Sequence, residues 1–216
     1  MVNWLIDKLI ILPGIIIGLS VHEFGHAWVA QLCGDDTAKA QGRVSLNPLD
    51  HIDWVGFISL IAFGFGWGRP VIINPRNFKK PRLNSVMVGL AGVFNNFICA
   101  WIFAFLLRLM YELSPNFFFM TGFGTALTDI AAQTVVTNLA LMLFNLIPIP
   151  PLDGFGVISD IINLPRLSWK AYIWLRKYGQ IILIIFIFAG GTRLIMTPPL
   201  SAIYNWMMRC VFSVFA

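Results

Sequence analysis

Long apolar runs are the feature that most limits what this chain can fold into. A membrane-spanning helix needs about 20 apolar residues. Four stretches of about that length are almost free of charge, namely residues 9–33, 85–107, 131–152 and 178–199. Of the 216 residues only 12% are charged, about half the share in an ordinary soluble domain. The sequence therefore predicts an all-α polytopic membrane protein with four to six membrane-embedded helices, and it argues against a disordered chain, a disulfide scaffold or a nucleic-acid-binding module.

Two further apolar segments are less regular. Residues 54–68 are uncharged and rich in glycine, and as a helix of about 1.5 Å per residue they would cover only about two thirds of a bilayer core. We expect this segment to re-enter the membrane or to pack among the spans without crossing. Residues 200–216 could form an interfacial helix or a final span. Because no repeat or long linker divides the chain, residues 1–216 are expected to form a single membrane-embedded domain.

Basic residues are unevenly distributed between the loops. If residues 54–68 do not cross, loops 34–84 and 165–177 lie on one side of the membrane and carry eleven of the 15 Lys and Arg residues. Basic loops stay in the cytoplasm, so we expect the N-terminus outside. Within the first loop, residues 42–46 and 71–73 contain β-branched residues between Gly, Asn and Pro, which favours a short β-hairpin at the cytoplasmic interface.

The first apolar run contains His22-Glu23-Phe24-Gly25-His26, an H-E-x-x-H pattern. Residues four apart share one face of a helix, so both imidazoles can bind one ion while Glu23 lies beside it. Ionisable groups inside a bilayer are costly and usually mark a functional site. A polar stripe that bonds to neighbouring helices is the alternative, but it would not need three such groups within five residues. The pattern predicts one Zn²⁺ per chain.

A catalytic zinc usually takes three protein ligands, so this site needs one from elsewhere in the chain. Asp153 is the leading candidate because it follows a proline-rich break in the third span, and broken helices in membranes often line sites. Spacing alone leaves open that Asp153 caps the following helix instead. Asp129 and Asp160 are competing candidates. His51, in an acidic loop, is expected to be solvated or to cap a helix.

The order of the spans gives a separate check on Asp153. If residues 54–68 do not cross, the chain leaves the first span on the cytoplasmic side, crosses outward between 85 and 109, and returns between 128 and 150. Asp153 then reaches the cytoplasmic half of the membrane, where the two histidines also lie. The metal geometry and the charge asymmetry therefore predict the same topology, with the active site facing the cytoplasm.

Three segments together resemble the signature elements of the site-2 protease family of intramembrane zinc metalloproteases. They are His22 to His26, then Gly92-Val93-Phe94-Asn95-Asn96 in the next span, and residues 145–154, which end in Leu152-Asp153-Gly154. Residues 42–49 and 74–78 are similar to the compact prokaryotic branch without a PDZ domain. The resemblance covers about residues 9–200 and implies regulated intramembrane proteolysis by a single membrane-embedded metalloprotease domain in a prokaryotic cell membrane.

The resemblance also implies roles for individual residues. The implied zinc ligands are His22, His26 and Asp153. Glu23 would be the catalytic acid and base, while Asn145 and Asn96 would be substrate-binding or oxyanion-stabilising residues. Asn96 also ends a G-x-x-x-N helix, whose small residue lets spans approach closely. Asn145 could instead bond backbone groups freed by the helix break, and the two interpretations stay open.

The sequence thus predicts a zinc-dependent intramembrane endopeptidase that hydrolyses peptide bonds within or next to the transmembrane segments of membrane-protein substrates. The expected partners are those substrates and the lipid bilayer, without nucleic acid, and no oligomeric state is indicated. One alternative is a non-catalytic membrane binding protein that retains a structural zinc, which would not need Glu23. Another is a zinc transporter, although a single closed three-ligand site is a poor conduit.

Overall fold

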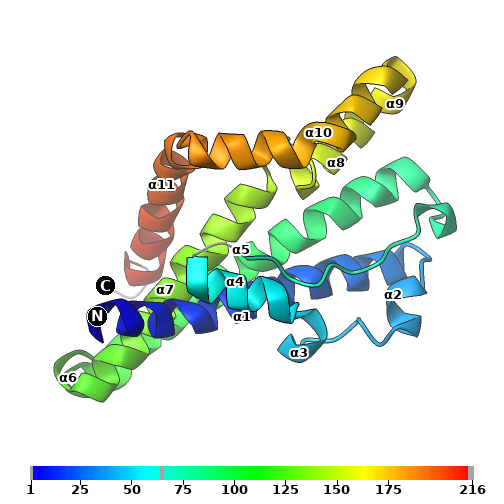
Figure 1. Cartoon of the computed structure of the whole chain (residues 1–216). Coiled ribbons are helices and arrows are strands. Elements are labelled where there is room, and N and C mark those ends of the chain that lie inside the picture. Colours follow the sequence, from blue (N-terminus) through cyan, green and yellow to red (C-terminus); the bar gives the residue numbers. More distant parts are fainter. Residues whose placement is uncertain (1, 64–65, 214–216) are drawn as a thin grey trace.

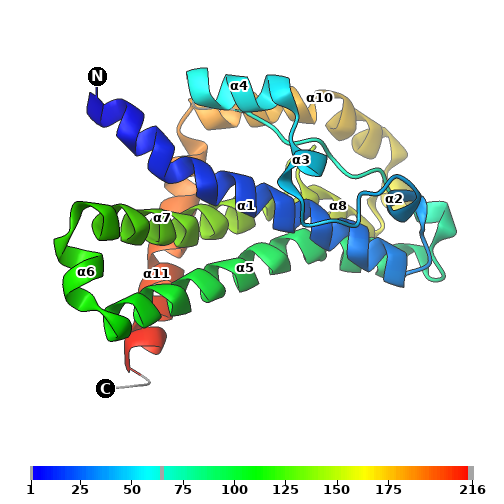
Figure 2. The ribbon, with the colours of Figure 1, turned by 90° about the horizontal axis from the view of Figure 1, so that it is seen from below.

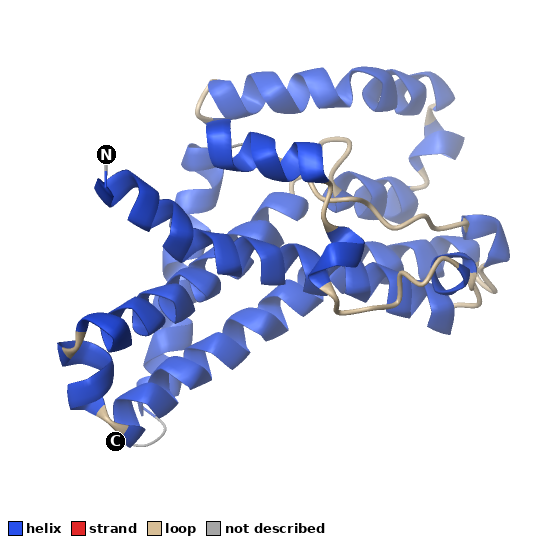
Figure 3. Cartoon of the chain, turned by 60° about the horizontal axis from the view of Figure 1, so that its bottom comes forward, coloured by secondary structure: helices blue, strands red, loops and turns tan. Residues whose placement is uncertain are grey.

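The computed structural model describes residues 2–63 and 66–213, and its regular elements in these ranges are helices (Figures 1 and 3). They are α1 (Val2–Leu32), α2 (Thr37–Ala40), α3 (Pro48–His51), α4 (Trp54–Phe63), the 3-10 turn η1 (Pro75–Asn77), α5 (Pro81–Leu113), α6 (Pro115–Met120), α7 (Gly122–Asn145), α8 (Asp153–Ile162), α9 (Leu164–Leu167), α10 (Trp169–Phe188) and α11 (Gly191–Ser213). Four of the described helices are long and apolar enough to cross a membrane, namely residues Lys8–Leu32 of α1, α5, α7 and α10. The prediction of an all-α polytopic membrane protein is confirmed.

The helices α1, α5 and α7 form the centre of the molecule. They pack against one another along much of their length, and α6 connects the adjacent ends of α5 and α7 (Figure 2). An apolar core of mostly small and aliphatic side chains lies between α5, α7 and α11, including Ala100, Ala104, Leu139, Met207 and Val211. The three central helices thus provide a tightly packed frame for any side chains that point between them.

The predicted fourth span, residues 178–199, is wrong in its bounds. The chain turns after Phe188, and Gly190 has a φ of 79°, in the left-handed region that glycine adopts at the end of a helix. An apolar run does not reveal such a turn, because the residues on both sides of it are hydrophobic. The predicted span is therefore divided between α10 and α11, and α11 returns to pack on α5 and α7. Residues 214–216 of the predicted tail lie outside the described residues.

The segment between α1 and α5 does not form the expected hairpin. Residues 42–46 and 71–73 contain no strand, and the one isolated bridge in the described ranges joins Ile52 to Gly68. The reason is that backbone donors in and directly after the second segment bind side chains of α1 and of the residues that follow it. The Val71 N–H donates to Glu23, and the Asn74 N–H donates to Asp35. Helix α4 has 10 residues, a length of about 15 Å, which is about half the thickness of the hydrocarbon core of a bilayer.

Candidate metal centre

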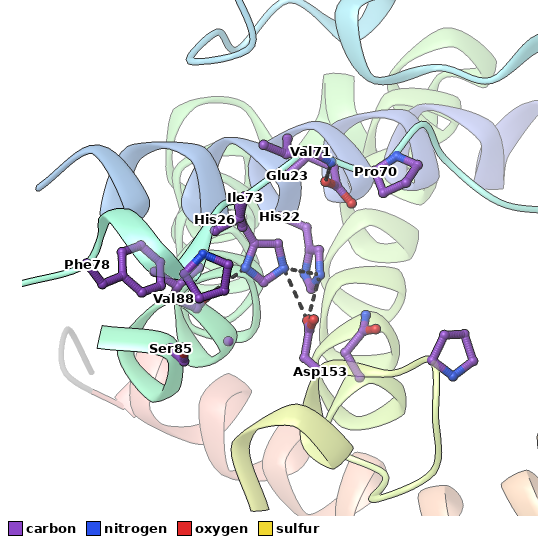
Figure 4. Close-up of a pocket in the computed structure, with 14 residues that line it drawn as sticks. His22, Glu23, His26, Pro70, Val71, Ile73, Phe78, Ser85, Val88 and Asp153 are labelled. Atoms are coloured by element: carbon purple, nitrogen blue, oxygen red, sulfur yellow. Dashed lines mark hydrogen bonds and ion pairs between the residues drawn. The ribbon is translucent and has the colours of Figure 1, made fainter. Parts of the chain in front are cut away.

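Three side chains from two distant parts of the chain meet at one point between α1, α5 and α8 (Figure 4). The Nε2 atom of His22 lies 3.0 Å from Asp153 Oδ2, and the Nε2 atom of His26 lies 3.2 Å from the same oxygen. The two Nε2 atoms are 3.0 Å apart. The structure therefore brings together the three residues that the sequence suggested as ligands, whereas Asp129 and Asp160 are not part of this group.

The two imidazoles lie on the face of α1 that is turned toward α5. Both residues are almost fully buried, with relative exposures of 6% for His22 and 7% for His26. They fit between the helices because Gly92 of α5 has no side chain. A Cβ atom at Gly92 would come within 2.7 Å of ring atoms of both histidines. Helix α5 therefore needs a glycine where it passes the imidazoles.

A hydrogen bond behind each imidazole sets which nitrogen carries the proton. The Nδ1 atom of His22 lies 2.7 Å from Asn96 Oδ1, and that of His26 lies 2.7 Å from the backbone oxygen of Val88. Both partners are oxygen acceptors, so each Nδ1 is the protonated nitrogen and donates to its partner. Each Nε2 consequently presents a lone pair toward Asp153, which is the arrangement of histidines that ligate a metal.

The three converging atoms fit a cation. Two unprotonated Nε2 atoms and a carboxylate oxygen are all acceptors, and Asp153 Oδ2 is buried without a hydrogen-bond donor. Acceptors this close together repel one another unless a positive charge lies among them. Two neutral imidazoles and one carboxylate are a donor set that suits Zn²⁺ and leaves a coordination position for water or substrate. The residues present therefore fit the zinc site that the sequence suggested.

Asp153 reaches the histidines because α7 stops and the chain folds back. Helix α7 ends at Asn145, a proline-containing turn follows, and Asp153 is the first residue of α8. The N-cap position of α8 is Leu152, and the Asp153 carboxylate faces the imidazoles, so the capping interpretation does not describe its contacts. Gly154 permits this fold, since a Cβ there would lie 2.3 Å from the backbone oxygen of Leu146.

A cavity of about 360 Å³ adjoins the three side chains. Its lining includes the candidate ligands together with Glu23, Asn145, Val71, Ile73 and Val88. The wall opposite the central helices is the segment of residues 69–78, which we call the strap and which is extended as far as the turn η1. It runs from the end of the α4 region to α5 and passes over α1 beside Glu23 (Figures 1 and 4). The cavity thus has one wall of packed helices and one wall of extended chain.

Glu23 is held by the backbone of the strap. The Val71 N–H donates a hydrogen bond of 2.8 Å to Glu23 Oε2. The strap is attached near this point by the Arg43 guanidinium, whose Nη2 donates to the backbone oxygen of Arg69 at 2.6 Å. Glu23 is therefore placed in the cavity next to the histidines, with one carboxylate oxygen bound and partial access to solvent.

The far end of the strap is fastened to Asp35, which follows α1 and is fully buried. The carboxylate accepts hydrogen bonds from the Asn74 N–H at 2.7 Å and from Asn77 Nδ2 at 2.8 Å, and it also accepts from the hydroxyl of Thr37. Burial by itself would raise the pKa of Asp35, but these hydrogen bonds outweigh it and hold the pKa below its ordinary value. Asp35 therefore remains ionised and acts as an anchor for the strap.

The remaining candidates lie in different surroundings. Asn145 lines the cavity, and its Nδ2 donates to the backbone oxygen of Leu141 at 3.0 Å, so both interpretations of this residue stay predictions. Asn96 is fully buried behind His22 and is not part of the cavity lining, a position that does not support direct contact with substrate. His51 is neither solvated nor a cap as expected. It is buried, and its Nε2 donates to the backbone oxygen of Ser45 at 2.7 Å.

Sequence reasoning missed Asn138 and Asp35. Asn138 is fully buried in α7 and bonds to Asn96. Its signal was an amide inside an apolar span, because such side chains commonly bond between membrane helices. Asp35 had no comparable signal, since an aspartate just after a helix is usually a solvated loop residue.

Known proteins resemble this chain over 73% to 96% of its length. "Putative zinc metalloprotease YwhC" of Bacillus subtilis (strain 168) is 38% identical over 201 residues, which cover 93% of this chain and 90% of that protein. The chain belongs to this family of zinc metalloproteases. "Putative zinc metalloprotease Rip2" of Mycolicibacterium smegmatis is 27% identical over 96% of this chain and 73% of its own length. "Putative zinc metalloprotease MJ0611" of Methanocaldococcus jannaschii is 28% identical over 73% of this chain and 68% of its own length.

No family model and no solved structure matches the chain. The assignment to the zinc metalloprotease family therefore comes from whole-chain similarity to individual members. It agrees with the convergence of His22, His26 and Asp153 in the structure.

Proposed function

We propose that this membrane protein is a zinc-dependent intramembrane endopeptidase of the site-2 type. Its substrates would be transmembrane proteins, cut within or next to their membrane-spanning segments. The observation that carries the proposal is the meeting of His22, His26 and Asp153 beside Glu23, on helices that belong to a membrane-embedded bundle. Membership of the zinc metalloprotease family supports the metal and the reaction class. The apolar helices around the site support cleavage within the bilayer.

In this proposal each polar residue of the cavity has a chemical task. His22, His26 and Asp153 would hold one Zn²⁺, which when bound supplies a Lewis acid that polarises the substrate carbonyl and lowers the pKa of water. Glu23 would take a proton from the attacking water and deliver it to the nitrogen of the departing amine as the C–N bond breaks. The Val71 N–H binds only Oε2, which leaves Oε1 for this exchange.

Asn145 is the candidate for stabilising the substrate carbonyl oxygen. It lies at the edge of the cavity, and its amide has a second N–H beyond the one that donates to Leu141. A hydrogen-bond donor aimed at an oxygen that gains negative charge accelerates acyl transfer. The alternative task, closing the end of α7, uses the bond to Leu141 alone. An Asn145→Ala variant would lower kcat strongly at nearly unchanged thermal stability under the first interpretation, whereas its main effect under the second would be a loss of stability.

The form in which a substrate is cut follows from its own hydrogen bonds. In an α-helix the backbone carbonyl oxygens are bonded to N–H groups of the same helix. A transmembrane substrate would therefore unwind locally before cleavage, so that the carbonyl of the cleaved bond becomes accessible. We expect the opening to face the cytoplasm, with the N-terminus outside, because the basic loops lie on that side.

A comparison of wild type with Glu23→Gln tests this function. The variant keeps the ligands and the shape of the side chain, so it should bind one Zn²⁺ per chain and lose proteolysis. Quantitative proteomics of membranes from cells that contain either form should show fragments of transmembrane proteins in the wild type alone. The same fragments in both would contradict the proposal.

The same pair of proteins separates the alternatives. Equal effects of wild type and Glu23→Gln on the cell, without cleavage by either, would favour a non-catalytic binding protein that keeps zinc for structure. Zinc flux into proteoliposomes that contain the purified chain would favour a transporter.

A further inference from the structure

Two buried amide groups behind His22 connect the three central helices by hydrogen bonds. Asn96 of α5 and Asn138 of α7 are both fully buried. Asn96 Oδ1 lies 2.7 Å from His22 Nδ1, and Asn96 Nδ2 donates to Asn138 Oδ1 at 3.0 Å. Neither amide lines the cavity beside the candidate ligands. These residues therefore touch the candidate ligand from behind, and they contact neither substrate nor metal.

The orientation of the Asn96 amide follows from its neighbours. The backbone oxygen of Gly18 lies 2.9 Å from one end of the amide, and a carbonyl oxygen can only accept. That end must be the NH₂ group, which leaves Oδ1 facing His22. An acceptor at this position requires the proton of His22 to lie on Nδ1.

The orientation of Asn138 is determined in the same way. The backbone oxygen of Thr134 lies 2.9 Å from one end of the Asn138 amide, so that end is also the NH₂ group. Its Oδ1 atom is thereby turned toward Asn96, where it accepts the second N–H of the Asn96 amide. Both N–H groups of Asn96 are satisfied only in this arrangement.

The two histidines differ in the kind of acceptor that their Nδ1 atoms meet. His26 donates to the backbone oxygen of Val88, and the helix itself fixes the position of that atom. His22 donates to a side-chain amide, which could in principle present either an oxygen or an NH₂ group. With the amide reversed, two N–H groups would face each other unless the His22 proton moved to Nε2, the atom that faces Asp153. The reversed orientation would therefore place a proton where the metal is held.

We propose that Asn138 is a positioning residue for the zinc ligand His22, and that it acts through Asn96. The hydrogen bonds run from a backbone oxygen of α7 through Asn138 and Asn96 to His22 of α1. Each side chain in this path is buried, so water does not readily replace a missing partner. The inference rests on the proposed zinc site. It adds that a residue of α7 with no contact to the metal holds the Asn96 amide together with the Gly18 carbonyl, and so stabilises the Nδ1-protonated form and the orientation of His22.

The test measures metal affinity of the purified full-length chain in detergent, by competition with a chelator for Zn²⁺. Loss of an outer partner of a ligating histidine typically costs 10- to 100-fold in metal affinity, and we expect a loss of about that size for Asn96→Ala. Asn138→Leu keeps the branching of the side chain, adds volume and removes the acceptor, so it should cost about 5- to 10-fold, the equivalent of one net hydrogen bond. The visible absorption of bound Co²⁺ should change in both variants.

A double variant separates a relay from general damage to packing. If Asn138 acts through Asn96, then Asn96→Ala combined with Asn138→Leu should bind Zn²⁺ as Asn96→Ala alone does. Independent losses that multiply would overturn the proposal, as would an unchanged affinity and Co²⁺ spectrum in Asn138→Leu. Should this variant not fold, Asn138→Ala removes the same acceptor without adding volume.

Two neighbouring residues provide matched controls. Asn95 also bonds from α5 to α1, through its Nδ2 and the backbone oxygen of Val21, but it does not touch a histidine. Thr134 is a buried residue one turn before Asn138, and its hydroxyl bonds to the backbone oxygen of Ile130. Asn95→Ala and Thr134→Val should leave the Co²⁺ spectrum and the Zn²⁺ affinity unchanged. Similar losses in these controls would show that any polar deletion at this depth weakens the site and would overturn the specific role of Asn138.

This measurement is independent of proteolysis. A wild-type chain that binds Zn²⁺ and shows the coupling between Asn96 and Asn138, but cuts no substrate, would retain the positioning role and refute the proposed function. If the wild type cuts substrate and Asn138→Leu binds Zn²⁺ as tightly as the wild type, the proposed function would be retained and the positioning role of Asn138 would be refuted.

Discussion

The two walls of the cavity are built in opposite ways. On one side, His22 and His26 are almost fully buried, and each has its Nδ1 atom bonded to an oxygen on a central helix. On the other side, Glu23 is partly exposed and is bonded to one backbone N–H of the strap. The side with His22 and His26, which we call the histidine wall, belongs to packed helices. The strap is attached through a few side chains near its two ends.

This difference matches the tasks proposed for the residues on the two sides, which are metal binding for the histidines and general-base catalysis for Glu23. Metal ligands work best when their geometry is fixed before the metal arrives, because ordering them later would cost binding energy. A general base must meet water, exchange protons and make room for a substrate. The comparison implies that changes in the histidine wall should act on metal affinity, and that changes in the strap should act on turnover and local stability.

Gly92→Ala should have the largest effect, because it adds volume to the rigid wall. The new methyl group would lie 2.7 Å from ring atoms of both histidines, and the imidazoles cannot move away without losing Asn96 and Val88. We expect metal affinity and proteolysis to fall by at least about 100-fold, the typical cost of displacing a reacting group by about 1 Å. Zinc content after dialysis and cleavage of a substrate identified by proteomics would both be measured.

Gly156→Ala is the matched control, because a Cβ atom there meets nothing within 4 Å. It should bind zinc as the wild type does. If Gly92→Ala also kept its zinc, the histidine wall would be more adaptable than its packing indicates, and the contrast between the two walls would be lost.

Asp35→Ala should release the strap while leaving the histidine wall intact. The substitution leaves the Asn74 N–H and the Asn77 amide without their acceptor, and an unsatisfied buried donor costs about 2 kcal/mol. Hydrogen exchange at the Asn74 amide should accelerate by about 30-fold, the equivalent of that free energy. Asp36→Ala is the control, since Asp36 is exposed and its ion pair with Lys39 is worth little. Equal exchange in wild type and Asp35→Ala would mean that other contacts hold the strap.

Val71→Pro tests the single bond between the strap and Glu23. Proline lacks the N–H group that donates to Glu23 Oε2, so the carboxylate loses its orientation while every candidate metal ligand is retained. We expect kcat to fall by about 10-fold, part of the 10²- to 10⁴-fold that a positioned base contributes, with unchanged Zn²⁺ affinity. Val71→Ala keeps the N–H group and should retain near-normal kcat. Equal losses in both variants would assign the effect to the valine side chain instead of its amide.

The sequence predicted the histidine wall better than the strap, for a physical reason. Charge-free runs and the four-residue spacing of His22 and His26 are periodic features of helices, and the position of the helix break led to Asp153. Asp153 could not be assigned with certainty from spacing, since only the fold brings it within 3.2 Å of both imidazoles.

The strap had no such periodic signal. Its β-branched residues favoured a hairpin, but the contacts that fix it use the Val71 and Asn74 N–H groups, which every residue except proline has. The buried state of Asp35 and the turn at Gly190 were missed for the same reason, since each depends on where distant segments meet or end. Asn138 is the exception, because an amide in an apolar span could have been recognised.

The smallest expected effect is the response of the strap to acid. The pKa of Asp35 is lower in the folded protein than in the unfolded chain, where an aspartate has a pKa of about 3.9. Its stabilising contribution is therefore complete above that value and is lost as the pH falls through the folded pKa. Hydrogen-exchange protection of the Asn74 amide, corrected for the intrinsic exchange rate, should stay constant from about pH 8 to pH 5 and should fall a few-fold below about pH 4. Asp35→Ala should lack this acid-dependent loss, and Asp36→Ala should keep it. A loss of protection between about pH 7 and pH 6 would instead implicate a histidine, which would mean that the strap and the histidine wall respond together and are not the separate units compared above.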